Sequence, residues 1–114
     1  MGEKPSVAVR RERGVTIADV TGDIDVSTVS GLRERLLGLA DSGEPLIVDL
    51  NQVSFIDSAG LGVLVAVARR ADTLGGSLHA VCSQAPARKL LWLTGVDRRI
   101  PLTDTVDEAL TQLT

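Results

Sequence analysis

The chain has 114 residues, 44% apolar and 24% charged, so one soluble globular domain over residues 1–114 is expected, with residues 1–5 flexible. A net charge of −3 with one Phe, one Trp and no Tyr argues against nucleic-acid binding, which needs a basic face and stacking aromatic residues. The longest uncharged apolar run, residues 58–68, is too short to cross a membrane, no signal peptide opens the chain, and the single Cys82 excludes an internal disulfide. We therefore expect a cytoplasmic protein with no membrane partner.

The first predicted elements are two strands and a helix. Residues 7–10 and 15–20 are rich in β-branched residues and are separated by a turn containing glycine, which predicts a β-hairpin. Residues 22–25 are expected to form a loop or a short extended piece. The helix that follows has Asp25 or Ser27 as its expected N-cap. Its apolar stripe comprises Val29, Leu32, Leu36, Leu37 and Ala40.

Residues 45–50 form an apolar run broken only by Asp49, which is typical of a strand covered on both faces. A turn rich in hydrogen-bonding side chains is expected next, followed by a long helix over residues 58–74 that ends at Gly75-Gly76. The remaining predicted elements are a strand over 77–82, a helix over 86–94, a short strand over 100–102 and a last helix capped by Asp104 or Thr105.

The order of these elements predicts the fold class. Strands that alternate with helices indicate an α/β domain. We expect a single mixed, mostly parallel β-sheet of about four or five strands, with helices packed on it and a hairpin at one side. No repeat or linker divides the chain.

The segment around Asp57 and Ser58 carries the strongest functional signal. If Asp57 is the N-cap of the long helix, Ile56 and Leu61 occupy the positions of a hydrophobic staple. Ser58 then lies in the first turn with its hydroxyl free. A phosphate on that hydroxyl would meet the unpaired N–H groups and the partial positive charge of the helix start. The alternative is a plain helix-start serine, which spacing alone favours.

The long helix has two further unusual features. Gly60 and Gly62 each cost about 1 kcal/mol of helix propensity relative to alanine, which suggests that something approaches the backbone closely. The helix also carries two apolar stripes. The stripe expected to face the sheet comprises Leu61, Leu64, Val65 and Ala68. The second stripe comprises Val63, Ala66 and Val67, and is either covered by neighbouring helices or open to a partner.

Enzymatic readings lack supporting motifs. His79 is expected to be an edge or partly buried strand residue, since no nucleophile elbow, phosphate loop or metal cluster accompanies it. Cys82 is expected to be a buried core residue. Asp49 is interpreted as a structural residue on the loop side or at the end of a strand, because the acidic pair and the lysine of an aspartyl-phosphate receiver are not evident. We therefore do not expect an enzyme.

Two remaining features are interpreted as structural. Trp92 is expected in the core. The basic pairs Arg88-Lys89 and Arg98-Arg99 are interpreted as solvated surface, with contact to an acidic partner as the alternative.

Three motifs together carry a family resemblance. They are residues 22–25 (GDID), residues 48–64 (VDLNQVSFIDSAGLGVL) and Gly75-Gly76. Their combination resembles a STAS domain, and more closely the bacterial anti-sigma-factor antagonists, over about residues 15–113. One departure is Ala59, where many relatives carry a second Ser or Thr. That departure leaves Ser58 as the only hydroxyl in the turn.

The resemblance implies a partner-switching module of transcription regulation, of the kind used in stress response or sporulation. In such modules the unphosphorylated antagonist binds an anti-sigma factor that is also an ATP-dependent serine kinase, and thereby frees a sigma factor. Phosphorylation of Ser58 would end that binding, and a PP2C-like phosphatase would restore it.

The resemblance further implies a monomer or weak dimer with no cofactor or metal of its own. The partner-binding residues that it implies are Gly22, Asp23, Asp25, Ser27, Thr28, Asp57, Ser58, Ala59, Gly60, Gly62 and Val63. The alternative is a STAS scaffold or ligand sensor that is not regulated by phosphorylation.

Overall fold

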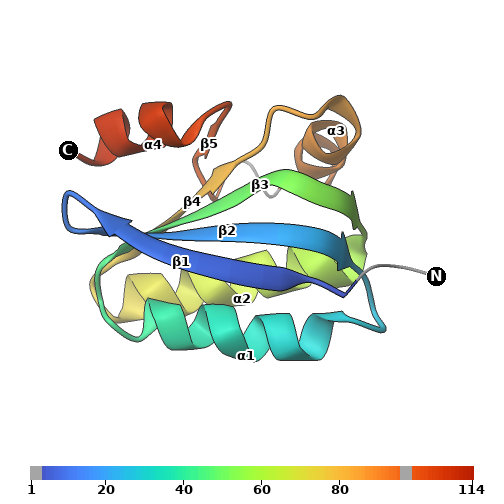
Figure 1. The fold of residues 1–114 in the computed structure, drawn as a ribbon, viewed down its shortest axis with the longest axis horizontal. Coiled ribbons are helices and arrows are strands. Elements are labelled where there is room, and N and C mark those ends of the chain that lie inside the picture. Colours follow the sequence, from blue (N-terminus) through green and yellow to red (C-terminus); the bar gives the residue numbers. More distant parts are fainter. Residues whose placement is uncertain (1–3, 96–98) are drawn as a thin grey trace.

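The computed structural model describes residues 4–95 and 99–114. Within these residues, five strands form one sheet in the order β1-β2-β3-β4-β5, as Figure 1 shows. β1 is antiparallel to β2, and every other neighbouring pair is parallel. The strands are β1 (Ser6–Glu12), β2 (Val15–Ile24), β3 (Pro45–Ile56), β4 (Ser77–Val81) and β5 (Leu102–Thr103). The predicted mixed, mostly parallel sheet with an edge hairpin is confirmed.

Helices cover both faces of the sheet. They are α1 (Val29–Ala40), α2 (Ser58–Thr73), α3 (Ala85–Thr94) and α4 (Val106–Leu113). α1 and α2 lie side by side along one face, whereas α4 lies on the other (Figure 1). α3 lies near the end of β3. The predicted order of strands and helices is therefore confirmed.

The core consists of two apolar clusters separated by the sheet. Along β3, Leu46, Val48 and Leu50 belong to the larger cluster, which includes the buried faces of α1 and α2. Ile47 belongs to the smaller cluster beneath α4. The alternation follows from the strand geometry, in which successive side chains point to opposite faces. It explains why residues 45–50 are apolar almost without interruption.

Three strands are longer than predicted, and the first of them, β1, spans Ser6–Glu12 where residues 7–10 were expected. β3 continues through the segment that was expected to be a turn and ends at Ile56, while β2 continues to Ile24. The distal half of β3 pairs only with β2, because the pairing with β4 ends at Asp49. Polar residues are tolerated there since they reach solvent or bond other segments. Asn51 is an example: its side-chain oxygen accepts from the N–H of Ser83 at 2.7 Å.

Predictions about three single side chains have different outcomes. Asp49 lies inside β3, not at a strand end, and its carboxylate accepts from the N–H of Asn51 at 2.9 Å. Trp92 is 67% exposed, so its predicted core position is wrong. α3 instead buries Leu91, the preceding residue, whose side chain lies about 100° around the helix from that of Trp92. Cys82 is fully buried, as predicted.

The chain ends and one loop complete the comparison. The expected flexible segment 1–5 lies partly outside the described residues, as does Arg98 of the second basic pair. The fifth strand was expected over 100–102 but forms at Leu102–Thr103, because Ile100 enters the core ahead of it. In the part of the chain that the structure describes, no helix is long and apolar enough to span a membrane.

Candidate functional site

The start of α2 is built around an aspartate cap, as predicted. Asp57 is the N-cap, and its Oδ1 accepts hydrogen bonds from the N–H groups of Ala59 at 2.9 Å and Gly60 at 3.2 Å. The Asp57 N–H donates to the carbonyl of Ile24 at 3.1 Å, which joins the start of α2 to the end of β2. Such a cap contributes about 1 kcal/mol relative to alanine. Ser58 is therefore held as the first residue of the helix.

The Ser58 side chain is exposed, and its hydroxyl makes no hydrogen bond with any described residue. The hydroxyl is thus free, as predicted. The prediction that a phosphate here would meet several free donors is wrong in part, because the Asp57 carboxylate already accepts from Ala59 and Gly60. A phosphate would lie beside that carboxylate and would be repelled by it. It would therefore extend toward solvent or a partner.

The two glycines of α2 differ in their surroundings. A Cβ at Gly60 would lie 2.6 Å from Cγ1 of Ile56 and 2.7 Å from Cγ2 of Ile24. The group that approaches Gly60 is therefore this chain's own core, not a partner. A Cβ at Gly62 would meet nothing within 4 Å, and Gly62 is exposed. The fold gives no reason for glycine there, so its bare backbone is open to an incoming surface.

The segment 23–28, which we call the acidic loop, contains Asp23 and Asp25. The hydrogen bond from the Asp57 N–H to the Ile24 carbonyl joins this loop to the start of α2. The Thr28 hydroxyl donates to the carbonyl of Asp23 at 2.8 Å. The N–H and the hydroxyl of Ser27 both donate to Oδ1 of Asp25, at 2.9 and 2.6 Å. Hydrogen bonds from its own hydroxyl side chains therefore hold the loop and fix the position of the Asp25 carboxylate.

Gly22 sets the direction of this loop. Its φ of +92° lies in the left-handed region, which a residue with a Cβ adopts only at a cost. The register between β2 and β3 shifts at this point, between Gly22 and Asp23. Such an irregularity bends a strand and redirects the side chain that follows. Gly22 is buried and acts through the backbone.

The N-cap of α1 is Thr28, so the predicted caps Asp25 and Ser27 are wrong. Those side chains bond to each other within the loop and not to the helix. The Thr28 hydroxyl is also directed into the loop, and α1 has no side-chain cap. The side chains that could have capped α1 therefore form hydrogen bonds within the loop instead.

The hydrogen bonds of the loop also affect its charge. The hydroxyl of Ser27, followed by the backbone N–H of Ser27, lowers the pKa of Asp25 below its ordinary value. Asp25 is consequently an anion at neutral pH. We call the surface formed by the acidic loop and the start of α2 the rim around Ser58. Asp25 and Asp57 make this rim acidic.

Val63 does not belong to the exposed rim. It is 4% exposed and lies in the core together with Val67, because α1 packs against α2 there. Neighbouring helices thus cover these two members of the second stripe. The resemblance implied that Val63 contacts a partner. Because its side chain is buried, that expectation is wrong for the side chain. Val65 and Ala68, expected to face the sheet, are only half-buried.

Two exposed apolar residues, in the loop after β2 and at the end of β3, were missed from the sequence. Val26 of the acidic loop is 78% exposed and Phe55 of β3 is 53% exposed. Large apolar side chains in solvent beside a bare helix start are typical of a protein-binding surface. Val26 could have been found as the one apolar residue within a polar loop. Phe55 could not have been found in this way. In a regular strand, Val53 and Phe55 would lie on the same face, yet Val53 is buried.

The remaining chemical candidates lie apart from this rim. His79 of β4 is in register with Ile47 and therefore points to the face that α4 covers. Burial lowers the pKa of His79 and raises the pKa values of Asp49 and Cys82. Among the described residues, no group of three or more His, Cys, Asp or Glu side chains could hold a metal ion. His79 does not approach Ser58, so these residues form no catalytic triad.

Comparison with known proteins assigns the chain to a family. The STAS domain family model matches residues 6–109. The anti-sigma-B factor antagonist of Bacillus subtilis is 38% identical over 91 residues, which cover 80% of this chain and 84% of that protein. The anti-sigma-F factor antagonist RsfB of Mycobacterium tuberculosis is 31% identical and covers 93% of this chain and 87% of its own length.

A solved structure agrees with this match. The crystal structure of an anti-sigma factor antagonist from Mycobacterium paratuberculosis is 32% identical, with a TM-score of 0.85 over 96% of this chain and 93% of that chain. The residues that the family model matches include all five strands of the sheet and Ser58. This chain therefore belongs to the STAS domain family, alongside relatives that are anti-sigma-factor antagonists.

Proposed function

We propose that this chain is an anti-sigma-factor antagonist with a switch at Ser58. Its unphosphorylated form binds an anti-sigma factor and so frees a sigma factor, and phosphorylation of Ser58 ends that binding. The observation that carries the proposal is the exposed and unbonded Ser58 hydroxyl at a capped helix start. The names of the relatives, which include the anti-sigma-B factor antagonist of Bacillus subtilis, support the class of partner.

The proposed binding surface combines apolar, polar and acidic parts. Val26 and Phe55 supply apolar area, and Gly62 allows close approach to the helix backbone. Asp23 and Asp25 border this area. Burial of such apolar side chains against a partner provides the main favourable free energy of association. Ser58 follows Phe55 by three residues, and its neighbour Asp57 bonds Ile24 at the end of β2, so we propose that a partner on this surface covers Ser58.

Phosphorylation would change the charge of this surface and leave the fold intact. A phosphate adds about −1.5 to −2 charges at neutral pH. It would stand beside the Asp57 carboxylate and near the anionic Asp25. A partner would have to desolvate all of these charges to rebind, and like charges juxtaposed at an interface cost several kcal/mol. No rearrangement of α2 is needed for the switch.

The proposal includes two enzymes that act on this chain. The anti-sigma factor is itself the serine kinase and carries the ATP, while a PP2C-like phosphatase removes the phosphate. The chain needs no cofactor or catalytic residue for this function, and works in the cytoplasm as a monomer or weak dimer.

Release of a sigma factor tests the proposal. Complexes of each anti-sigma factor of the source organism with its sigma factor are mixed with the unphosphorylated chain without ATP. We expect that one complex yields free sigma factor and a new complex of the chain with the anti-sigma factor, as seen by size-exclusion chromatography. If the chain binds an anti-sigma factor without releasing sigma, it is a scaffold. If no anti-sigma factor binds the chain, the proposal is wrong.

A further inference from the structure

One hydroxyl at the end of the acidic loop bonds two backbone groups at its beginning. The Thr28 hydroxyl donates to the carbonyl of Asp23 at 2.8 Å and accepts from the N–H of Asp25 at 3.0 Å. These two backbone groups flank Ile24, the last residue of β2. The Thr28 N–H also donates to the Asp25 carbonyl at 3.0 Å. Thr28 therefore closes the loop on itself.

The peptide group between Ile24 and Asp25 is held from both sides. Its N–H donates to the Thr28 hydroxyl at 3.0 Å, and its carbonyl accepts from the N–H of Asp57 at 3.1 Å. Asp57 is the N-cap of α2, and Ser58 follows it. Hydrogen bonds in series polarise and strengthen one another. A continuous chain of hydrogen bonds thus runs from the acidic loop to the residue before Ser58.

The Thr28 hydroxyl stabilises this chain instead of capping α1. A threonine at an N-cap ordinarily accepts from the N–H of the second or third helical residue. Thr28 is the N-cap of α1, yet its side chain makes no cap hydrogen bond and no acidic residue lies in the first turn of the helix. Thr28 is also half-buried, whereas Asp57 and Ile24 are joined through the backbone. The hydroxyl therefore acts on the arrangement of the loop and not on the helix that Thr28 begins.

We propose that Thr28 is a positioning residue, whose hydroxyl fixes the acidic loop relative to the start of α2, so that an anti-sigma factor meets the loop and Ser58 in one arrangement. This inference rests on the proposed function. It assigns to Thr28 an action through the backbone, whereas the resemblance implied a contact with the partner. A loop that is ordered before binding removes the free-energy cost of ordering it in the complex.

Two substitutions separate the hydroxyl of Thr28 from its methyl group. Thr28→Val keeps nearly the same shape and loses the hydroxyl, whereas Thr28→Ser keeps the hydroxyl and loses the methyl group. In the free, unphosphorylated chain, Thr28→Val is expected to speed amide hydrogen exchange at Asp57 about tenfold, because the peptide that accepts from this N–H loses its own partner. Thr28→Ser should exchange as the wild type does. Nuclear magnetic resonance measures both, and the amide of Val48, in the middle of β3, reports global unfolding.

The Kd for the anti-sigma factor, measured by isothermal titration calorimetry, tests the consequence for binding. Thr28→Val is expected to weaken binding about tenfold, since the loop would then have to be ordered in the complex. Thr28→Ser should stay within about threefold of the wild type. The matched control is Thr111→Val, which removes a hydroxyl that donates to the carbonyl of Asp107 at 2.9 Å. It lies in α4, on the face of the sheet opposite α1 and α2, and should change neither the Kd nor the exchange at Asp57.

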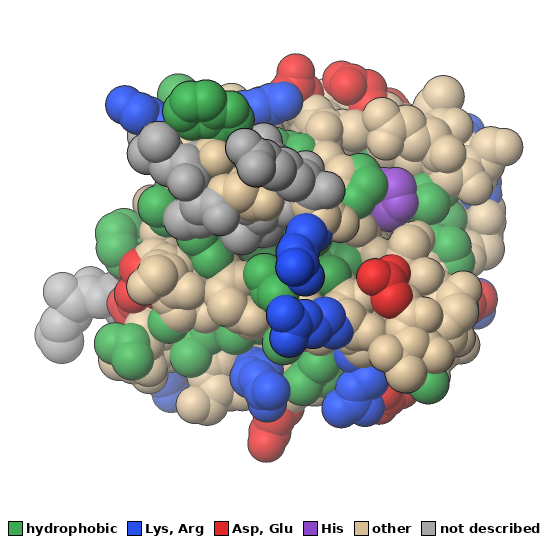
Figure 2. Space-filling model, turned by 180° about the vertical axis from the view of Figure 1, so that it is seen from behind, with side chains coloured by type: hydrophobic (Ala, Val, Ile, Leu, Met, Phe, Trp, Pro, Cys, Tyr) green, Lys and Arg blue, Asp and Glu red, His purple; other side chains and the backbone are tan. Residues whose placement is uncertain are grey.

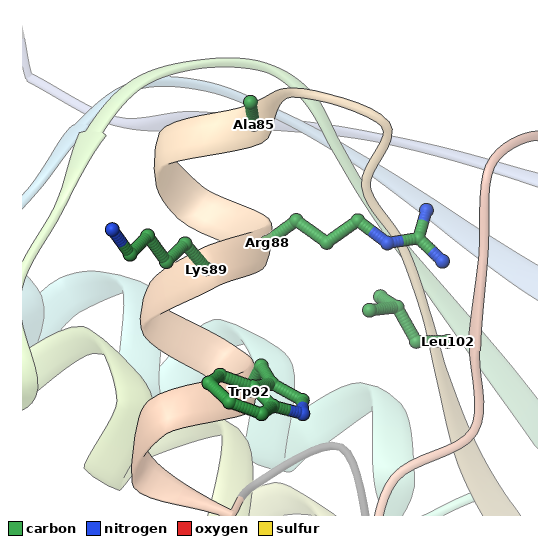
Figure 3. A pocket seen from close by; sticks show the side chains of 5 residues that line it. All are labelled: Ala85, Arg88, Lys89, Trp92 and Leu102. Atoms are coloured by element: carbon green, nitrogen blue, oxygen red, sulfur yellow. The ribbon is translucent and has the colours of Figure 1, made fainter.

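The only tryptophan of the chain shows whether a variant disturbs the fold beyond the loop. Trp92 lines a groove of about 580 Å³ together with Ala85, Arg88, Lys89 and Leu102 (Figure 3). Figure 2 shows, at the position of α3, a hydrophobic side chain between basic ones. In the order of the strands, β3 and β4 separate β2, which leads into the acidic loop, from β5, which carries Leu102. The emission maximum of Trp92 should therefore be the same in the wild type and in all three variants.

Three results in the free chain or its complex would overturn the positioning role. If Thr28→Val leaves the exchange at Asp57 unchanged, the hydroxyl does not hold the start of α2. If the exchange quickens equally at Asp57 and Val48, or the emission of Trp92 shifts, the hydroxyl stabilises the whole fold. If binding weakens while the exchange at Asp57 stays the same, Thr28 contacts the partner directly.

The test also separates this inference from the proposed function. If Asp57 exchanges faster in Thr28→Val and the Kd equals that of the wild type, the arrangement of the loop does not matter for binding, and the inference is wrong while the proposed function stands. If the wild type binds no anti-sigma factor, both are wrong.

Discussion

Phosphorylation of Ser58 is expected to weaken binding to the anti-sigma factor by about two to three orders of magnitude. The phosphate would stand beside the Asp57 carboxylate, whose Oδ1 already occupies the N–H groups of Ala59 and Gly60. The fold therefore cannot neutralise it fully, and the partner would have to desolvate it. Isothermal titration of the phosphorylated and unphosphorylated chains against the same anti-sigma factor measures the difference.

Ser58→Ala is the control for this effect. It removes an exposed hydroxyl that bonds no described residue, so the variant should bind nearly as well as the unphosphorylated wild type. The unfolding midpoints of all three forms should agree within a few degrees. Equal affinities of the phosphorylated and unphosphorylated chains would show that Ser58 lies outside the interface. A large loss of stability on phosphorylation would show instead that the switch acts through the fold.

Gly60→Ala is expected to destabilise the fold by up to about 2 kcal/mol. The new Cβ would lie 2.6 Å from Ile56 and 2.7 Å from Ile24, and overpacking of this kind costs about 1–3 kcal/mol. The better helix propensity of alanine returns about 1 kcal/mol. Both isoleucines are β-branched and buried, so they have little freedom to move aside. Urea unfolding monitored by circular dichroism measures the difference.

Gly62→Ala serves as the matched control two residues along the same helix. No atom lies within 4 Å of the position that its Cβ would take, so only the propensity gain of up to about 1 kcal/mol remains. The two variants should thus change the free energy of unfolding in opposite directions. The same Gly62→Ala variant should weaken partner binding if the bare backbone is covered in the complex. Equal stability of both variants would contradict the tight packing at Gly60.

The sequence predicted those features that depend on local chemistry. The order of elements followed from hydrophobic periodicity and from glycine at helix ends, and all of the predicted strands and helices are present. Asp57 was identified as the N-cap from the spacing of Ile56 and Leu61, and its hydrogen bonds confirm it. The free hydroxyl of Ser58 followed from that cap.

Features that depend on tertiary neighbours could not be predicted in this way. The distal half of β3 contains Asn51 and Ser54 and resembles a turn, yet it is held as a strand by β2 on one side. Trp92 resembles a core residue by type, but the buried side of α3 is supplied by Leu91. The hydroxyl of Thr28 was available for capping and bonds the carbonyl of Asp23 instead. In each case a contact outside the local pattern decides between two locally acceptable arrangements.

The exposure of the apolar residues of the rim also depends on tertiary neighbours. Nothing in the local pattern separates the exposed Phe55 from the buried Val53, because the register shifts between β2 and β3 alter which side chains are covered. The proposed partner surface was placed from Ser58 and the acidic loop. Its apolar part became visible only in the folded chain.

The measurement that tests the switch most directly is the intact mass of the chain after incubation with ATP and the anti-sigma factor that binds it. We expect the wild type to gain the mass of one phosphate and Ser58→Ala to gain none, although the chain also carries hydroxyl groups at Ser27, Thr28 and Ser30. A wild type that binds the anti-sigma factor and gains no mass, or a Ser58→Ala variant that gains as much as the wild type, would contradict a switch at Ser58.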